Sequence, residues 1–190
     1  MGAITPIGTG KEAFWNAMME GKNGIGRITR FDPEGFHAQI AGEVKDFDPT
    51  DYIDKKESKR MDRYTQFAVA TAGMAIKDAG LDLGKENLER IGTYVGTGIG
   101  GIETMHSQYE KYFAKGPSRI SPFFVPMMIA NMAAGQVSIE YKLHGPSSCV
   151  VTACATGTNC IGDAFRVIQH GGADVMLAGG TEAAISQAAV

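Results

Sequence analysis

The chain has 190 residues, of which 25 are glycine, and a formal net charge of −3. Its ordinary apolar and charged fractions, 44% and 21%, exclude a disordered chain, and the lack of a three-residue glycine period excludes collagen. The slightly acidic balance argues against general nucleic-acid binding, which needs a basic face.

Nothing in the sequence predicts a membrane or secreted protein. No apolar stretch reaches the roughly 18 residues of a membrane span. The N-terminus lacks the charged start and apolar core of a secretory signal. Three cysteines imply no disulfide framework, so we expect a cytoplasmic protein with reduced thiols.

Helices and strands alternate after an irregular first third. In chain order, the sequence predicts a loop over 1–10, a helix over 11–20, a possible strand over 39–44, a helix over 62–79, a strand over 90–96, a helix over 103–113, a largely buried helix over 126–143, a strand over 147–153, a helix over 156–170 and a strand over 173–178. This alternation indicates an α/β fold with a mainly parallel sheet. Glycine pairs after the strands allow sharp turns where α/β folds bind ligands.

The clearest of these elements is the helix over 62–79. Asp62 is a suitable N-cap, and Gly80 is a suitable stop. Apolar residues lie along one stripe, and many of them are alanine. The helix is therefore expected to pack closely against another helix or a sheet.

Cys154 lies in the segment CVVTACATGTNCIG, where a β-rich run becomes a helix. A thiol at a helix N-terminus is favoured as thiolate by unpaired amides and the helix dipole. The arrangement is that of a nucleophile elbow with sulfur in place of oxygen, and the same amides could hold an oxyanion. On spacing alone, a buried core cysteine is the commoner arrangement, and we interpret Cys149 and Cys160 in that way.

The segment GTGIGG over 96–101 matches the dinucleotide-binding pattern G-x-G-x-x-G after a strand. That fingerprint also requires an acidic residue about 20 residues further on. The corresponding region, GPSRISP, contains no acid and no strand comes before it. A tight, closely packed turn is the simpler interpretation, with nicotinamide binding as the alternative.

The remaining polar clusters predict neither a metal site nor a catalytic base. The four histidines have no metal-like or base-like spacing, and we expect no metal and no cofactor. A basic cluster follows residue 54, comprising Lys55, Lys56, Lys59, Arg60 and Arg63. Such a run is usually a solvated face, but on an acidic chain it could attract an acidic partner.

Five segments together carry a resemblance to a known family: GAITPIG, GTGIGG, GPSRISPFFVPMMIANMAAG, GPSSCVVTACATG and ADVMLAGGTEAA. In their order and spacing they resemble the elongating β-ketoacyl-acyl carrier protein synthases, most closely those of type II. The resemblance covers essentially the whole chain, and TACATG with SPFFVPMMIANM is highly specific. It implies the N-terminal half of a thiolase-like fold, with a mainly parallel sheet covered by helices.

The resemblance also implies an activity and its residues. Cys154 would accept an acyl group from acyl carrier protein, and its backbone amide would help form the oxyanion hole. Decarboxylative condensation with malonyl-carrier protein would then lengthen the chain by two carbons. Ile99 would border the acyl pocket, and Phe124 would reach it from the partner of a homodimer, in which the strand over 147–153 faces the partner. Lys56, Lys59 and Arg60 match positions that meet the acidic carrier protein.

The chain departs from the family pattern at both ends. It begins after the family's first strand and stops before the two catalytic histidines and the structural lysine, so residues 1–190 are expected to be a clipped N-terminal half. We expect this piece to leave an apolar helix face exposed and not to complete the condensation. The alternatives are a polyketide ketosynthase, and a non-catalytic remnant or half-subunit paired with a separate second half.

Overall fold

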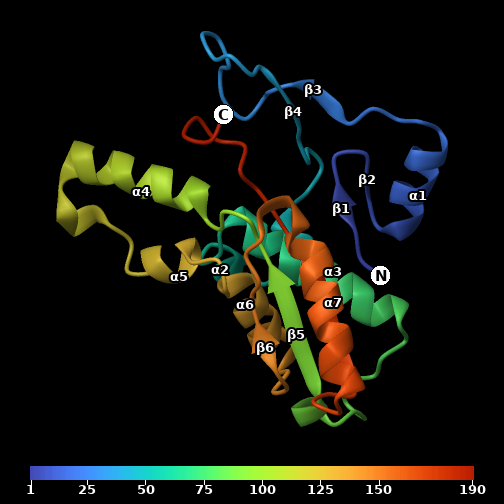
Figure 1. The fold of residues 1–190 in the computed structure, drawn as a ribbon. Coiled ribbons are helices and arrows are strands. Elements are labelled where there is room, and N and C mark those ends of the chain that lie inside the picture. Colours follow the sequence, from blue (N-terminus) through green and yellow to red (C-terminus); the bar gives the residue numbers. More distant parts are fainter.

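The computed structural model describes all 190 residues and is built around a small parallel sheet (Figure 1). Strand β5 (Ile91–Gly96) lies between β6 (Ser147–Ser148) and β7 (Val175–Gly180), and both neighbours run parallel to it. The strands predicted over 90–96 and 173–178 are confirmed. The strand predicted over 147–153 is wrong in length, because only its first two residues pair with β5.

Helices cover the two faces of this sheet. On one face, α3 (Arg63–Asp78) and α6 (Met132–Tyr141) pack on Val95 and on each other. On the other face, α7 (Thr156–Gln169) packs along β5 and β7. Parallel strands covered on both faces are the arrangement expected of an α/β fold.

Small residues bring α3 close to α6, as the alanine-rich stripe predicts. Ala68 and Ala72 of α3 and Ala133 and Ala134 of α6 are all buried in one cluster. Asp62 caps α3 by accepting a hydrogen bond from the Tyr64 amide. The helix predicted over 62–79 is therefore confirmed, together with its cap.

The single helix predicted over 126–143 is wrong. The segment forms α5 (Phe124–Met128) and α6, separated at Ile129, whose backbone is extended. The carbonyls at this break have partners elsewhere: Met128 accepts from the Gly101 amide at 2.9 Å, and Ile129 from the Tyr64 hydroxyl at 2.6 Å. Only α6 contains buried residues, so the segment is not buried throughout.

The other elements are short or peripheral. Two antiparallel strand pairs are present: β1 (Ile4–Thr5) with β2 (Gly8–Thr9), where a loop was predicted, and β3 (Ile25–Arg27) with β4 (Ile40–Gly42). The remaining helices are α1 (Lys11–Met19), α2 (Lys55–Ser58) and α4 (Ile102–Lys115). Four 3-10 turns lie at Pro49–Asp51, Leu88–Arg90, Pro117–Arg119 and Ala153–Ala155. Helices α4 and α5 extend to one side of the sheet (Figure 1). None of the helices combines the length and apolarity needed to span a bilayer.

Helix α7 has an exposed apolar flank beside the face that packs on the sheet. Cys160 and Ala164 face the sheet and are buried. Ile161 and Phe165, each about 100° further around the helix, are 58% and 65% exposed, and Ile168 is also exposed. The expectation of an exposed apolar helix face is confirmed.

Candidate active site

Cys154 lies in a strained turn at the N-terminus of α7. The turn is a single 3-10 segment, Ala153–Ala155, that continues directly into the helix. Ala153 has a φ of 50°, a left-handed conformation that is costly for a residue with a Cβ. Thr156 holds the turn from the helix side, since its hydroxyl accepts from the Thr152 amide at 2.9 Å. The predicted position of Cys154 at the start of a helix is confirmed, but the strand before it ends at Ser148 and does not reach the turn. Strain of this kind is typical of functional turns.

Two glycines let the strand ends approach this turn. A Cβ on Gly96, the last residue of β5, would lie 2.2 Å from the Val150 carbonyl oxygen and 2.4 Å from the Thr156 methyl group. A Cβ on Gly180, the last residue of β7, would lie 2.9 Å from the Cα of Gly157. The expectation that glycines shape the site is confirmed. Gly179 and Gly180 belong to β7, however, and do not form a turn after it.

The thiol opens into a cavity of about 560 Å³ that Ile99 also lines. The Cys154 side chain is exposed, and no backbone hydrogen bond of the chain uses its amide as a donor. A free thiol and a free amide therefore occupy the same residue, as attack on a carbonyl requires. The structure places Cys154 and Ile99 beside the same cavity, an arrangement consistent with what the family resemblance implies.

The other two cysteines differ from Cys154. Cys160 is fully buried against the sheet. Cys149 is half-buried, its thiol donates to the Ala130 carbonyl at 3.4 Å, and burial raises its pKa. Both are therefore poorer nucleophiles than an exposed thiol at a helix N-terminus. The prediction of a core position is confirmed for Cys160, whereas Cys149 lies only partly inside.

Glu182 is the residue of this site that the sequence did not indicate. Its carboxylate accepts from the Thr97 hydroxyl at 2.8 Å and from the amides of Gly98 and Ile99 at 2.8 and 3.2 Å. These amides belong to the GTGIGG loop, the segment that a dinucleotide phosphate would need. The loop is thus a nest already filled by a carboxylate of the chain, which argues against the nicotinamide alternative.

The basic cluster is smaller than the sequence indicates. Lys56 and Lys59 are exposed. Arg60 forms an ion pair with Glu57 at 3.1 Å and stacks over the Phe123 ring at 4.7 Å. Arg63 turns inward instead: it donates to the Val44 carbonyl at 2.9 Å and lies over two phenylalanine rings. Burial lowers the pKa of Arg63. Because Arg63 points inward, the cations of the cluster that reach solvent are Lys55, Lys56 and Lys59, with Arg60 half-buried.

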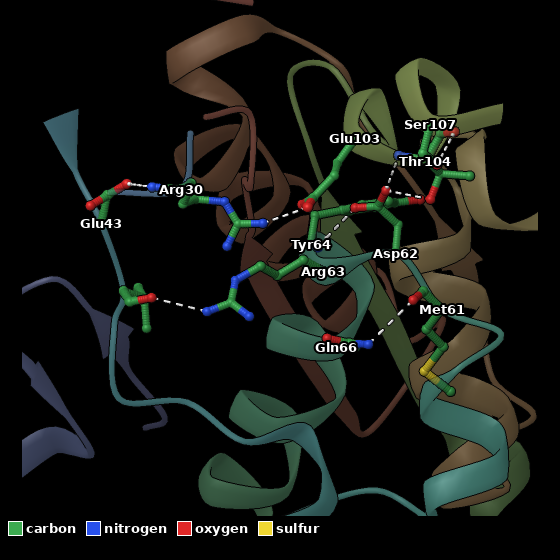
Figure 2. A network of polar contacts seen from close by, with 11 residues as sticks. Arg30, Glu43, Met61, Asp62, Arg63, Tyr64, Gln66, Glu103, Thr104 and Ser107 are labelled. Carbon is green, nitrogen blue, oxygen red and sulfur yellow. Dashed lines mark hydrogen bonds and ion pairs between the residues drawn. The ribbon is translucent and has the colours of Figure 1, made fainter. Parts of the chain in front are cut away.

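A polar network joins the start of α3 to the start of α4, the helix that follows the GTGIGG loop (Figure 2). Asp62 is buried, and its second carboxylate oxygen accepts from the Thr104 amide at 2.9 Å and from the Thr104 hydroxyl at 2.6 Å. Because the N-cap residue of α4 is Gly101, which has no side chain to cap the helix, Asp62 caps α4 as well as α3. Burial raises the pKa of Asp62 despite these hydrogen bonds.

Phe124 and the histidines lie away from the thiol. Phe124 is in α5 and packs edge-to-face on Tyr109, with ring centroids 6.4 Å apart, outside the cavity of Cys154 in its own chain. His106 lies 3.7 Å from Glu110, and His170 contacts the Arg166 carbonyl. No histidine lines the Cys154 cavity, and no group of three His, Cys, Asp or Glu side chains is placed to hold a metal.

An exposed cysteine in a strained turn, at a helix N-terminus beside the carboxyl ends of a parallel sheet, defines a candidate thiol acyltransferase site. The comparisons with known proteins specify the class. The model of the beta-ketoacyl synthase N-terminal domain matches residues 1–190, so the chain belongs to the beta-ketoacyl synthase family.

Curated relatives agree over the whole chain. The chain is 51% identical over 190 residues to "3-oxoacyl-[acyl-carrier-protein] synthase 2" of Staphylococcus aureus, covering 100% of this chain and 47% of the relative. It is 53% identical over 186 residues to the protein of the same name from Synechocystis sp., covering 98% of this chain and 45% of the relative. The chain therefore spans about half the length of the curated relatives it matches.

Solved structures share the fold. "The ishigamide ketosynthase/chain length factor" aligns with a TM-score of 0.88 and 33% identity, over 98% of this chain and 47% of that one. A type II polyketide ketosynthase complexed with its acyl-carrier protein and bound to a hexaketide aligns with a TM-score of 0.85 and 24% identity, over 99% and 50%. The fold is the N-terminal half of the thiolase-like ketosynthase fold, as the sequence predicts.

Proposed function

We propose that a protein containing this chain elongates fatty acyl chains on acyl carrier protein. The observation that carries the proposal is Cys154, with a free amide, in a strained turn beside a cavity lined by Ile99. The family and the name shared by relatives at 51% and 53% identity support the reaction type.

The reaction has two stages. The Cys154 thiolate attacks the thioester carbonyl of an acyl-carrier protein, a new carbon–sulfur bond forms, and the carrier's thiol leaves. Malonyl-carrier protein then loses carbon dioxide, and the carbanion attacks the acyl–cysteine carbonyl. The cysteine thiolate departs, and a 3-oxoacyl-carrier protein two carbons longer remains.

The chain's own residues serve the first stage. The amide of Cys154 would stabilise the oxyanion that develops on the carbonyl, and Ile99 would border the bound acyl chain. Phe124 would contribute to the pocket of the partner subunit in a cytoplasmic homodimer. Since no histidine lines the cavity, we expect the chain alone to stop at the acyl–enzyme.

The carrier protein would dock on the basic face formed by Lys56, Lys59 and Arg60. All three lie on or directly after α2, and two of them are exposed lysines. One solved neighbour is a ketosynthase in complex with its acyl-carrier protein. An acidic carrier would be steered to such a face, and the steering would weaken with salt.

Incubation of the chain with acyl- and malonyl-carrier protein tests the proposal. Intact-protein mass spectrometry should find a slowly formed acyl adduct on Cys154 and no 3-oxoacyl product. Cys154→Ala should abolish the adduct, whereas the matched variant Cys149→Ala should retain it. An adduct that survives Cys154→Ala would mean that the nucleophile is assigned to the wrong residue.

Two other functions have specific support. A polyketide ketosynthase is supported by solved structures, which are 33% and 24% identical in sequence to this chain. The relatives named 3-oxoacyl-[acyl-carrier-protein] synthase 2 are more similar, at 51% and 53% identity. A half-subunit that needs a second polypeptide is supported by the exposed apolar face of α7. An assay with a 3-oxoacyl-loaded carrier protein tests the polyketide function. Co-purification from the source cell tests for a second polypeptide that completes a half-subunit.

A further inference from the structure

We propose that Glu182 is a positioning residue that fixes the GTGIGG loop against the Cys154 turn and thereby sets the length of acyl chain that Cys154 accepts. The inference deepens the proposed function, because it treats the cavity beside Cys154 as an acyl site. It assigns the chain-length selection partly to a carboxylate that does no chemistry itself.

The first argument is the pattern of hydrogen bonds. One carboxylate oxygen of Glu182 accepts from the Thr97 hydroxyl, and the other accepts from the Gly98 and Ile99 amides. Thr97 in turn accepts from the Gly100 amide at 3.2 Å. Glu182 therefore holds, directly or through Thr97, every residue from 97 to 100, including the one whose side chain borders the cavity.

The second argument is the close contact between this loop and the nucleophile turn. A Cβ on Gly98 would lie 2.9 Å from the Glu182 carboxylate and 3.3 Å from the Cα of Ala153. The carboxylate and the strained residue before Cys154 thus lie too close to the loop to leave room for a side chain at position 98. A displacement of the loop changes the wall that faces the thiol.

The third argument is the charge of Glu182. None of the ion pairs of the chain includes it. Its charge is instead compensated by the two amides and the hydroxyl, and hydrogen bonds to an ionised group are roughly twice as strong as neutral ones. Loss of the carboxylate would leave both amides without their partner and free the Ile99 side chain, which is 53% exposed in the cavity.

Glu182 is also the link between two strands. It follows β7, whereas the loop follows β5, and Gly96 pairs with Gly180 in register. The Thr181 amide donates to the Gly96 carbonyl at 3.0 Å, and the Thr181 hydroxyl donates to the Tyr64 carbonyl at 2.7 Å. The backbone that carries Glu182 is therefore anchored, so that its carboxylate is a fixed point for the loop.

The test compares alkylation of Cys154 by a short and a long thiol reagent. Iodoacetamide and a decyl-substituted iodoacetamide are applied separately to the chain, and labelling rates are followed by peptide mass spectrometry. Glu182→Ala is expected to change the ratio of long to short rates at Cys154 about tenfold, the scale of one lost charge-assisted hydrogen bond. Glu182→Gln should change the ratio much less than Glu182→Ala, because its oxygen can still accept from both amides and its amide NH2 can donate to Thr97, although without the charge.

A matched control is available in Glu43. Its carboxylate also accepts from two amides and a threonine hydroxyl, those of Thr29 and Arg30, but Glu43 does not line the Cys154 cavity. Glu43→Ala should leave the ratio unchanged. An equal change in both alanine variants would overturn the inference, because general loosening would then explain it.

The other outcomes are equally decisive. An unchanged ratio in Glu182→Ala, with Cys154 still reactive, overturns the inference and leaves the proposed function standing. If Cys154 of the unaltered chain reacts with neither reagent, the proposed function fails and the inference fails with it. If Glu182→Ala does not fold, Glu182→Asp replaces it, since its shorter carboxylate must shift the loop; an unchanged ratio there also overturns the inference.

Discussion

Replacement of Asp62 by alanine should destabilise the chain more than loss of an ordinary helix cap. The change removes the cap of α3 and, at the same time, the only side-chain cap of α4. Loss of an N-cap costs about 1 kcal/mol. The Thr104 amide and hydroxyl, both buried, would also lose their acceptor, and an unsatisfied buried donor costs about 1–3 kcal/mol.

The burial of the Asp62 carboxyl offsets part of this cost. Its pKa is raised because burial disfavours the charged form, and alanine removes that penalty. The net effect of Asp62→Ala on the free energy of unfolding is therefore about 3 kcal/mol. In urea, the unfolding midpoint should fall by about 1–2 M, as a slope of about 2 kcal/mol per molar implies.

Asp54→Ala is the matched control. Asp54 also caps a helix, accepting from the Lys56 and Glu57 amides at 2.8 and 3.2 Å, but it is exposed. Water can replace its carboxylate, so that the midpoint should move much less. Equal midpoints for the two variants would refute the reasoning, because they would show that the second cap contributes nothing.

Three further predictions concern the site, the basic face and the pH dependence. Gly96→Ala places a Cβ 2.2 Å from a backbone oxygen. The free energy of unfolding measured in urea should therefore fall by about 3 kcal/mol. An unfolding midpoint equal to that of wild type would contradict the close approach. Lys59→Glu should weaken binding of acyl carrier protein about fivefold at low salt, as measured by calorimetry. The control Lys22→Glu should leave the affinity unchanged. Equal losses of affinity in the two variants would refute a specific docking face. Hydrogen bonding to Lys11 lowers the pKa of Asp78 to about 2 from 3.8. The difference in unfolding free energy between wild type and Asp78→Asn should therefore be constant above pH 4 and vanish as the pH falls through about 2. A constant difference at every pH would contradict the pairing.

The sequence predicts the elements whose signals are local. The helix over 62–79 has its own cap, its own stripe and its own stop, and α3 follows them closely. The helix predicted over 126–143 has an apolar run but no such boundaries. It breaks at Ile129 because distant groups, the Tyr64 hydroxyl and the Gly101 amide, take carbonyls that a continuous helix would use.

The basic face shows the same limit. A run of five cations predicts one surface, but Arg63 is the first residue of α3 and points toward the rings of Phe47 and Phe67. Its guanidinium also donates to the Val44 carbonyl, so it is directed into the protein and not toward a partner. The direction of a side chain depends on the phase of the helix, which the composition of the run does not contain.

Cys154 could be predicted from the sequence, whereas Glu182 could not. The cysteine has small neighbours and a following helix within a few residues, so its signal is contained in one segment. Glu182 acts on residues 97–99, more than 80 positions earlier, and the two segments meet only because β5 and β7 pair with Gly96 opposite Gly180. Once that register is known, the segment after β7 is expected to lie beside the loop after β5, since parallel strands end at the same edge, and Glu182 is the second residue of that segment. The nucleophile can therefore be identified from one segment of the sequence, whereas the shape of the cavity that faces it depends on how the strands of the sheet pair.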